Sequence, residues 1–481
     1  MSLMVDTRPI AHFGESCNKS LKGVFSGDTV TTMSADTVSL TGWGRTAPTT
    51  ALRFRPRTYE EAAVAVRGCG PRGSIARGLG RAYGDAAQNA GGSVLDMTAL
   101  NRIRTIDVAT GLVVCDAGVS LHRLMEVMLP LGWFVPVTPG TRYVTVGGAI
   151  GADIHGRNHH VSGSFSRHVQ DMELLTADGG IRTVRPGTAL FDATAGGMGL
   201  TGVILSATLR FQRVATSLMS VDTERAVDLD DLMARLTASD HRYRYSVAWI
   251  DLLARGRATG RSVLTRGEHA PLHALPTRSR RTPLAFRPGQ RPTAPAFVPN
   301  GLLGRASATL FNELWYRRAP TYRIGELQKL STFFHPLDGV PHWNRVYGRG
   351  GFVQYQFVVG IGQEETLRRI VRRISQQRCP SFPAVLKRFG NGDPGWLSFP
   401  MPGWTIALDL PATLPGLARF LDELDEEVAA AGGRVYLAKD SRLRPDALAA
   451  MYPRLPEFRA LRAELDPDGA FRSDLSRRLG L

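Results

Sequence analysis

The spacing of hydrophobic and polar residues alternates between helical and strand periods along most of the chain. In the first part it predicts two amphipathic helices, one over residues 58–69 with Thr58 as its N-cap and one over residues 120–132. Short β-branched runs bounded by glycine predict strands around them. Residues 172–184 have the pattern of two strands joined at Asp178-Gly179-Gly180, which is a hairpin signature. This part is therefore α+β, with strands outnumbering helices.

The second part of the chain, from about residue 213, has a different pattern. Three segments have strand periodicity and two have helical periodicity. These are residues 243–253, 350–360 and 403–411 for the strands, and residues 366–378 and 417–433 for the helices. Strands separated by helices in this way predict a second α+β domain with an antiparallel sheet.

These changes of pattern set the expected domain boundaries. Residues 1–36 are expected to form a disordered leader. Residues 37–212 form the first domain and residues 213–420 the second. A Pro/Arg-rich stretch, residues 266–305, is expected to be a mobile insertion in the second domain. Residues 421–481 are mostly helical and are expected to return to the first domain.

The net charge of the chain and its distribution indicate which classes of binding partner to expect. The formal net charge of +16 is typical of proteins that bind nucleic acid or an anionic surface. Residues 266–305 alone contain seven arginines and one acid, Glu268. A charged loop therefore explains much of the surplus, and no helix-turn-helix, zinc-finger or RNA-recognition signature is present. A basic nucleic-acid-binding scaffold stays as a remote alternative, whereas attraction to anionic lipid headgroups suits the loop.

Metal and membrane signals are weak. The four cysteines are far apart and have no metal-binding spacing. His155, His159, His160 and His168 suggest a zinc site, but no carboxylate or cysteine completes a ligand set, so we predict no metal. The sequence has no run of 18 apolar residues and no apolar segment near its start, so neither a membrane span nor a signal peptide is expected.

Two glycine-rich segments carry the strongest chemical signal. Residues 76–85 and 139–156 each follow a predicted strand and gather several backbone N–H groups. Such loops can enclose a pyrophosphate without a side-chain cation, and the alternative is that the glycines only make tight turns. A G-x-G-x-x-G match over residues 197–202 precedes a predicted strand. A dinucleotide-binding Rossmann motif needs a helix there, so we reject that interpretation.

The motifs resemble a known superfamily. RGLGRAYGD, TPGTRYVTVGGAIGADIHG, LLTADG and FDATAGGMGLTGVI resemble the FAD-binding domain of the vanillyl-alcohol oxidase superfamily. LTGWGRTAP, DIHGRNHH, ELWYRR, FHPLD, WNRVYG, GGFVQYQF and AKDSR follow in order. Together they resemble its oxidases that act on decaprenylphosphoryl ribose, and the likeness extends from about Leu40 to the C-terminus.

The resemblance implies a fold and an activity. It implies an α+β protein in which residues 37–212 hold FAD and an antiparallel-sheet domain covers the flavin. FAD is expected to be non-covalent, because residues 80–84 lack the histidine that bonds to the flavin in many relatives. The implied reaction oxidises the ribose C2′ hydroxyl of a polyprenyl-phosphate sugar to a ketone. This is the first half of an epimerisation that supplies arabinose for cell-wall arabinan.

The same resemblance implies partners. These are a polyprenyl-phosphate ribose substrate, an NADH-dependent keto-reductase and a quinone as electron acceptor, with peripheral contact to the inner membrane. The cytoplasmic side is expected, and the periplasmic face, reached without a signal peptide, is the alternative. An oxygen-dependent aldonolactone or alditol oxidase of the same fold is the alternative function.

Residues are carried over from the family by position. The expected FAD contacts are Ala76, Arg77, Gly78, Leu79, Gly80, Arg81, Ala82, Tyr83, Gly84, Asp85, Ala86, Gly140, Thr145, Val146, Gly147, Gly148, Ala152, Asp153, Ile154, His155, Ile204 and Tyr436.

Two residues are expected to carry the chemistry. The resemblance places Lys439 at the flavin and substrate, where an amine of lowered pKa accepts a hydroxyl proton. A surface lysine paired with Asp440 is the alternative. His155 lies in a glycine-rich turn, and its imidazole suits proton transfer near neutral pH.

The substrate pocket is expected to include eight residues. Gln354 and Gln356 alternate on one strand and therefore share a face. The full set is Gln354, Gln356, Lys387, Trp249, Phe389, Arg345, Phe334 and Ala407. A plain core role is the alternative for Trp249. Ala407 stands where well-known relatives have a cysteine and Phe334 where they have a tyrosine, so a thiol and a hydroxyl are expected to be missing.

Overall fold

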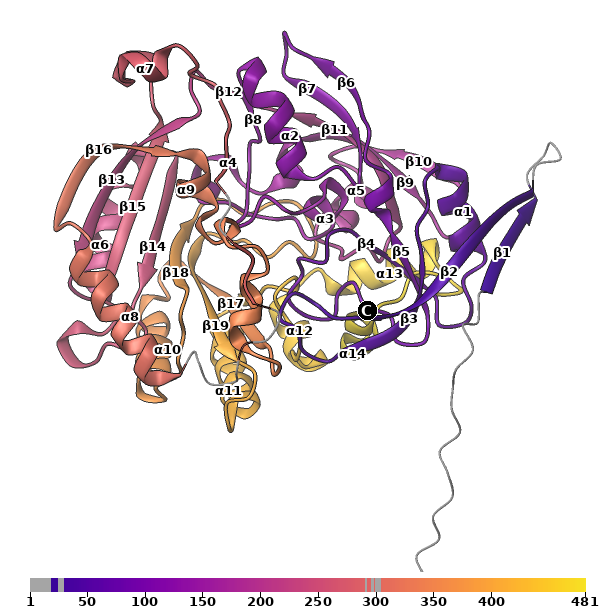
Figure 1. The fold of residues 1–481 in the computed structure, drawn as a ribbon. Helices are drawn as coiled ribbons and strands as arrows, with labels where there is room; N and C mark the ends of the chain where they lie inside the picture. Colours follow the sequence, from indigo (N-terminus) through magenta and orange to yellow (C-terminus); the bar gives the residue numbers. More distant parts are fainter. Residues whose placement is uncertain (1–18, 25–29, 290–291, 296–297, 299–303) are drawn as a thin grey trace, which may run out of the picture.

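The computed structural model describes residues 19–24, 30–289, 292–295, 298 and 304–481. Within these residues the strands form two five-stranded sheets, one eight-stranded sheet and a small two-stranded one. The five-stranded sheets come from the first half of the chain and most of the eight-stranded sheet from the second (Figure 1). This arrangement confirms the α+β prediction.

The first sheet contains a parallel core. Its strands, in spatial order, are β1 (Lys19–Val24), β2 (Val30–Leu40), β3 (Thr49–Phe54), β5 (Ser93–Asp96) and β4 (Ser74–Arg77). β3, β5 and β4 run parallel, and α1 (Tyr59–Arg67) connects β3 to β4. The Thr58 hydroxyl accepts the Glu61 N–H, so the predicted N-cap is confirmed.

The prediction of a disordered leader over residues 1–36 is only partly tested and partly wrong. Residues 1–18 and 25–29 lie outside the described residues. Residues 19–24 and 30–36 are strand, because β1 and β2 pair as an antiparallel hairpin and β2 continues into pairing with β3. The β-branched run that begins at Val30 favours this extended conformation.

The second sheet is antiparallel. In spatial order its strands are β10 (Ile181–Val184), β9 (Val169–Leu175), β11 (Val203–Arg210), β7 (Leu112–Asp116) and β6 (Ile103–Asp107). The hairpin predicted at residues 178–180 joins β9 to β10, and α2 (Leu121–Met128) begins after its cap Ser120. The G-x-G-x-x-G segment leads into strand β11, so its rejection as a Rossmann motif is confirmed.

The eight-stranded sheet is antiparallel throughout. In spatial order its strands are β16 (Tyr322–Lys329), β13 (Leu218–Ala226), β15 (Ser262–His269), β14 (Tyr245–Ile250), β18 (Ala384–Phe389), β19 (Gly403–Pro411), β17 (Phe352–Gly360) and β20 (Arg434–Val435). β20 comes from the C-terminal part of the chain.

One face of this sheet is a packed hydrophobic layer. Three helices cover it: α6 (Leu229–Ser239), α10 (Glu364–Gln376) and α11 (Leu417–Ala430) (Figure 1). Alternate strand residues such as Tyr355, Leu386 and Leu408 are buried against them. Because side chains alternate along a strand, the intervening residues lie on the opposite face. That face carries most of the residues predicted for the substrate pocket.

The Pro/Arg-rich segment begins later than predicted. Residues 266–269 belong to β15, where Arg266 is buried against Glu224, so they are not part of an insertion. Residues 290–291, 296–297 and 299–303 lie outside the described residues. Between them and β15, the short helix α7 (Thr277–Arg280) projects from the second half of the chain (Figure 1).

The C-terminal segment packs back against the first sheet. It forms α12 (Pro445–Met451), α13 (Leu455–Leu465) and α14 (Asp474–Leu479). The Ser74 N–H donates to the Ala470 carbonyl at 2.7 Å, and Arg478 forms ion pairs with Asp85 at 2.8 Å and Asp440 at 2.9 Å. The expected boundary at residue 421 falls inside α11, which packs on the large sheet.

The described helices are short. The longest, α8 (Arg305–Arg318) and α11, contain 14 residues each. Among the described helices, none combines the length and the apolar character that a bilayer span requires.

The Arg478 ion pairs should contribute measurably to stability. Because Asp440 is buried, Arg478→Ala leaves a carboxylate without its cation and is expected to cost about 2–3 kcal/mol. Arg419→Ala is the control, because this side chain is 89% exposed and pairs only at the surface with Glu423, so a change within about 0.5 kcal/mol is expected. Urea unfolding of the FAD-loaded protein measures both; equal shifts would contradict the assignment.

Candidate active site

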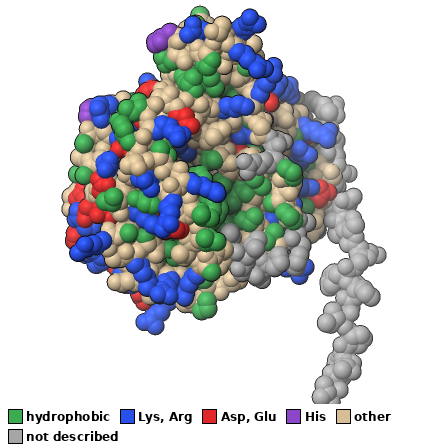
Figure 2. All heavy atoms as spheres, turned by 60° about the vertical axis from the view of Figure 1, so that its left-hand side comes forward, with side chains coloured by type: hydrophobic (Ala, Val, Ile, Leu, Met, Phe, Trp, Pro, Cys, Tyr) green, Lys and Arg blue, Asp and Glu red, His purple; other side chains and the backbone are tan. Residues whose placement is uncertain are grey.

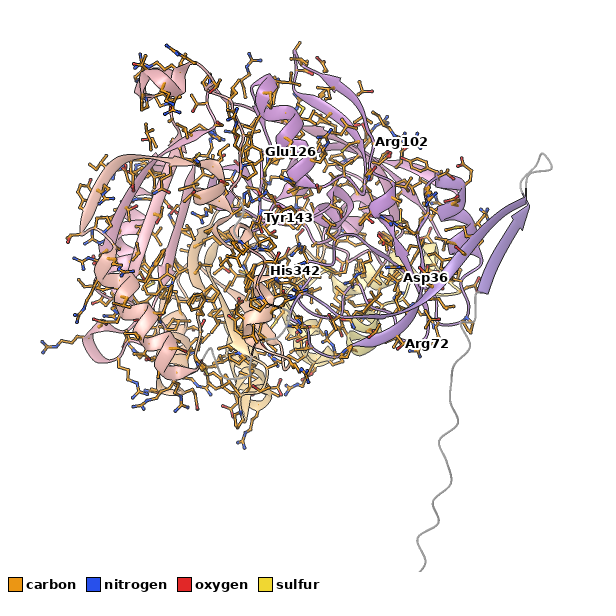
Figure 3. All side chains as sticks on the ribbon, in the orientation of Figure 1. Asp36, Arg72, Arg102, Glu126, Tyr143 and His342 are labelled. Carbon is orange, nitrogen blue, oxygen red and sulfur yellow. The ribbon has the colours of Figure 1, made fainter. Side chains whose placement is uncertain are left out.

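The two glycine-rich segments lie side by side. A Cβ atom built on Gly78 would lie 2.1 Å from the Thr145 hydroxyl, so only glycine allows this approach. The Arg81 guanidinium lies over the Tyr143 ring, 5.7 Å from its centroid. Tyr143 and His342 mark this seam between the two halves of the molecule in Figure 3. The sequence prediction that both segments build one site is therefore supported by their geometry.

The first segment also touches the C-terminal part of the chain. The Tyr83 N–H donates to the Ala438 carbonyl at 2.9 Å. A Cβ on Gly84 would lie 1.8 Å from the Asp440 carbonyl oxygen, so the two backbones are in direct contact. The side chain of Lys439, between these two carbonyls, is thereby held against the first glycine-rich segment.

The second segment contains a helix that the sequence did not predict. Residues Val146–Gly151 form α3, and the Thr145 hydroxyl caps it by accepting the Gly148 N–H. Apart from its chain neighbours, no atom of the described residues lies within 4 Å of a Cβ placed on Gly140, and only the Thr145 hydroxyl approaches one placed on Gly148. These open backbone positions fit the close approach of a pyrophosphate, which is what an FAD site requires here.

Three predicted FAD contacts use their side chains elsewhere. Arg77 donates to the Thr41 and Ala87 carbonyls, and Asp85 is paired with Arg478. Asp153 is buried and accepts the Ser166 N–H, at a backbone φ of +38°. These side chains shape the loops, and only their backbones are left to face a cofactor.

The remaining predicted cofactor residues converge. The Tyr436 hydroxyl donates to the Ala152 carbonyl at 2.7 Å, and its ring lies 5.5 Å from the His155 ring. Helix α3 packs on β11, which carries Ile204. Segment 152–155, Tyr436 and α3 therefore form one wall of the site.

The open face of the eight-stranded sheet forms the opposite wall. Strand register places Gln354 beside Asp409, Gln356 beside Ala407, and Ala407 beside Val385. Gln354, Ala407, Val385, Lys387 and Trp249 are all partly exposed although they lie in central strands. Side chains in such positions are exposed only where no packed layer covers them. The face is therefore open to a ligand.

His155 connects the two walls. Its Nε2 lies 3.0 Å from the Gln356 amide nitrogen, and its Nδ1 lies 3.1 Å from the Lys387 ammonium nitrogen. Burial and the neighbouring Lys387 lower the pKa of His155 well below its usual range. Lys387 is only partly exposed, and this desolvation, with Arg157 and Lys439 nearby, lowers its pKa to about 7. Both groups are therefore poised to be neutral at or just above neutral pH.

Lys439 has a similar setting. Its ammonium nitrogen lies 3.8 Å from the centroid of the Tyr83 ring. Burial lowers the pKa of Lys439 to about 7, and Asp409 opposes this shift. Asp440 is instead bound by Arg478 and by the backbone N–H groups of Arg442 and Leu443. The alternative of a surface lysine paired with Asp440 is therefore wrong.

Two residues predicted for the pocket lie elsewhere. Phe334 is 2% exposed and packs against Phe134 and Tyr245 in a separate core cluster, so its missing hydroxyl does not change the open face. Arg345 lies in the turn Trp343–Tyr347, where its guanidinium donates to the Ala294 carbonyl. Phe334 is the last residue of α9 (Leu330–Phe334), and its burial could not be inferred from the composition of that segment.

Trp249 and Phe389 do lie on the predicted face. The Trp249 indole packs edge-on against Trp315 of α8 at 6.5 Å, and its Nε1 has no hydrogen-bond partner among the described residues. Phe389 is buried against His155 at 4.8 Å. Trp249 is thus at the edge of the open face rather than in the packed core.

The other histidines have structural partners. His159 Nε2 lies 3.1 Å from Asp393, which also accepts the Ser164 N–H. His160 and His168 contact the backbone carbonyls of Tyr243 and Ser162. Asp393 and Asp409 were both missed by the sequence analysis. Neither stands in a motif with a chemical signature, and each joins the site through contacts with residues distant along the chain.

Comparison with known proteins agrees with this geometry. A family of FAD binding domains matches residues 50–185, and a D-arabinono-1,4-lactone oxidase family matches residues 363–479. A decaprenylphosphoryl-beta-D-ribose oxidase of Mycolicibacterium smegmatis is 48% identical over 92% of this chain and 98% of its own length.

Two further relatives have higher and lower identity to this chain than the ribose oxidase has. An uncharacterized protein of Streptomyces coelicolor is 56% identical over 76% of this chain and its whole own length. An alditol oxidase of a Streptomyces species is 26% identical over 92% of this chain and 99% of its own. The chain therefore belongs to the decaprenylphosphoryl-β-D-ribose oxidase family and is an FAD-dependent oxidoreductase of the vanillyl-alcohol oxidase type.

Proposed function

We propose that this protein oxidises the C2′ hydroxyl of a polyprenylphosphoryl ribose to a ketone, the first half of epimerisation to an arabinose donor for cell-wall arabinan. The observation that carries the proposal is the open sheet face on which Gln354, Gln356 and Lys387 meet His155 and Lys439. The 48% identity to the mycobacterial oxidase supports this substrate class.

FAD would be held by the two glycine-rich segments. We assign the pyrophosphate to the open backbone around Gly140 and Gly148, and the flavin to the part of the site beside Tyr436, His155 and Lys439. When bound, FAD supplies the acceptor for a hydride from the sugar carbon. The side chains around it have to orient the substrate and accept the hydroxyl proton.

Lys439 is the proposed proton acceptor. With a pKa of about 7, its amine is largely neutral above neutral pH and takes the proton as the C–H bond breaks. His155, Lys387 and Gln356 form a hydrogen-bonded chain that positions the sugar hydroxyls. The neutral imidazole can accept or donate a hydrogen bond according to its tautomer.

An alditol or aldonolactone oxidase that uses oxygen is the second candidate. The match of residues 363–479 to the arabinonolactone oxidase family favours it, as does the full-length likeness to an alditol oxidase. That likeness is 26%, against 48% for the ribose oxidase, so we place this candidate second.

We further propose peripheral membrane contact, a quinone as electron acceptor and a keto-reductase that reduces the ketone with NADH. The lipid substrate requires access to a membrane. Residues 271–289, which include α7, form a projection on the surface (Figure 2). This projection exposes Arg278, Arg281 and Arg287 together with Leu272. Basic and apolar side chains on one projection suit an anionic lipid surface.

The substrate proposal predicts a colour change. Anaerobic mixing of the FAD-loaded protein with a prenylphosphoryl ribose should bleach the flavin absorbance in a stopped-flow instrument, with formation of one ketone per flavin. Free alditols and aldonolactones should leave it unbleached. Rapid hydrogen peroxide production with free alditols, and none with the lipid sugar, would favour the second candidate.

Lys439→Met should slow flavin reduction by roughly 10²- to 10⁴-fold, because the proton acceptor is lost. The wild-type rate should rise with pH through about 7 as Lys439 loses its proton, and this limb should be absent in the variant. Lys439→Arg should be equally slow, because a guanidinium stays protonated. The exposed Lys329→Met is the control and should behave as wild type; a normal rate for Lys439→Met would rule out the role.

The membrane proposal predicts an effect of three arginines. Replacing Arg278, Arg281 and Arg287 by serine should weaken binding to vesicles containing anionic lipid by at least tenfold, at roughly 1 kcal/mol for each arginine. Arg280 is left in place because it donates to the His273 and Leu275 carbonyls. The control variant replaces the exposed Arg102, Arg182 and Arg419 by serine and therefore has the same net charge. Vesicle sedimentation measures the binding of both variants. If both lose the same amount of vesicle binding, the projection is not a specific membrane-binding surface.

A further inference from the structure

A row of side chains crosses the open face of the eight-stranded sheet. Strand register places Gln356 of β17 beside Ala407 of β19. Ala407 in turn lies beside Val385 of β18, and Val385 lies beside Trp249 of β14. Directly opposed residues of neighbouring strands point to the same face, and adjacent strands lie about 4.8 Å apart, so the row extends roughly 14 Å from Gln356 to Trp249. We call these four residues the cross-strand row.

The polarity of the cross-strand row changes from one end to the other. At its first end the Gln356 amide nitrogen lies 3.0 Å from His155 Nε2, and His155 Nδ1 lies 3.1 Å from the Lys387 ammonium nitrogen. The other three residues of the row, an alanine, a valine and a tryptophan, carry no charged group. A ligand that fits this row is therefore polar at one end and apolar at the other.

The apolar end of the row continues onto helix α8. The Trp249 ring packs against Trp315 of α8 with 6.5 Å between their centroids, and Trp315 stacks on Phe311 at 5.8 Å. Phe311 also contacts Phe382, which precedes β18, at 4.2 Å. A cluster of aromatic rings thus joins the edge of the open face to the helix.

Helix α8 keeps large apolar side chains on its outer surface. Leu310, Leu314 and Trp315 are 61%, 44% and 49% exposed. Because residues three or four apart are neighbours on a helix, Leu314 lies beside both Leu310 and Phe311. These four residues, Leu310, Phe311, Leu314 and Trp315, form an apolar surface that we call the α8 stripe.

The other side of α8 is held by polar contacts. The Asn312 amide donates to Asp251 at 2.7 Å, and Arg261 pairs with Glu313 at 2.6 Å and with Asp251 at 2.8 Å. These contacts fix the helix in place without burying the α8 stripe. An exposed apolar surface that is not needed for packing is typical of a binding surface.

We propose that the prenyl chain of the substrate leaves the sugar site along the cross-strand row and lies on the α8 stripe. This proposal rests on the proposed function, which places the ribose where Gln356 and His155 meet. A prenyl chain has no hydrogen-bonding group and is stabilised by apolar contact alone. The row and the stripe offer such contact from the sugar site out to the surface of the protein.

The length of the prenyl chain tests the proposal. The FAD-loaded protein is mixed anaerobically with geranylgeranylphosphoryl ribose or dimethylallylphosphoryl ribose, which differ only in the number of isoprene units. The longer chain reaches the stripe and should reduce the flavin with a second-order rate constant higher by roughly tenfold or more. In Leu310→Ser/Leu314→Ser most of this preference should be lost, because the concentration of the longer substrate that half-saturates the rate rises.

Two further variants give the control and a second test. Val108→Ser/Ile181→Ser removes two apolar side chains of similar exposure, 47% and 48%, from the region of the second sheet and should keep the wild-type preference. Trp249→Gln interrupts the cross-strand row and should reduce the preference. If Trp249→Gln does not fold, the double leucine variant decides alone, because its two side chains are exposed.

A binding measurement separates this inference from the proposed function. Geranylgeranyl phosphate and dimethylallyl phosphate, which carry no sugar, are titrated into the FAD-loaded protein by calorimetry below their critical micelle concentrations. The wild type should bind the longer chain roughly tenfold or more tightly, and Leu310→Ser/Leu314→Ser should lose this difference. If the difference behaves in this way but the ribose lipid is not oxidised, the proposed function fails and this inference stands. If the ribose lipid is oxidised but both chains bind equally well, the inference fails.

Two other occupants of the α8 stripe have distinct signatures. If a second copy of the chain covers the stripe, Leu310→Ser/Leu314→Ser changes the oligomeric state in sedimentation velocity. If a bilayer covers it, the variant loses binding to uncharged phosphatidylcholine vesicles. Either change with the wild-type chain-length preference intact overturns the proposal, as does an intact preference on its own.

Discussion

The site depends on one close contact between two backbones. At Gly84 the first glycine-rich segment touches the Asp440 carbonyl so closely that any Cβ would collide with it. Together with the bond from Tyr83 to the Ala438 carbonyl, this contact fixes where Lys439 can lie. Segments about 350 residues apart in the sequence are thereby in direct backbone contact.

The two faces of the eight-stranded sheet have different roles. One face is apolar and packed by α6, α10 and α11, which supplies the burial that holds the second half together. The other keeps polar side chains in a poorly solvated space, where each needs a partner. Gln356, His155 and Lys387 contact one another, and the Gln354 amide donates a hydrogen bond to Asp409. The same desolvation lowers the pKa of Lys387 and of Lys439 to about 7.

The relatives show how one scaffold serves several substrates. The ribose oxidase and the alditol oxidase both align with nearly the whole chain, so the shared fold does not choose between them. Under the proposed function, the choice of substrate depends on the side chains of the open face. Ala407 lies there between Gln356 and Val385 and contributes no ionisable group. The ionisable side chains that the structure places beside this face are Lys387, His155 and Lys439.

The sequence by itself determined the local structure and the main chemical candidates. Capping residues fixed the starts of α1 and α2, glycine placed the β9–β10 hairpin, and the family motifs identified Lys439, His155 and the paired glutamines. Tertiary structure alone decided that Asp409 meets Gln354, that Phe334 is excluded from the open face, and that residues 266–269 belong to β15. The physical reason is strand register. Gln354 and Asp409 meet because β17 and β19 pair across a long stretch of chain, and such pairing leaves no periodic signal near either residue.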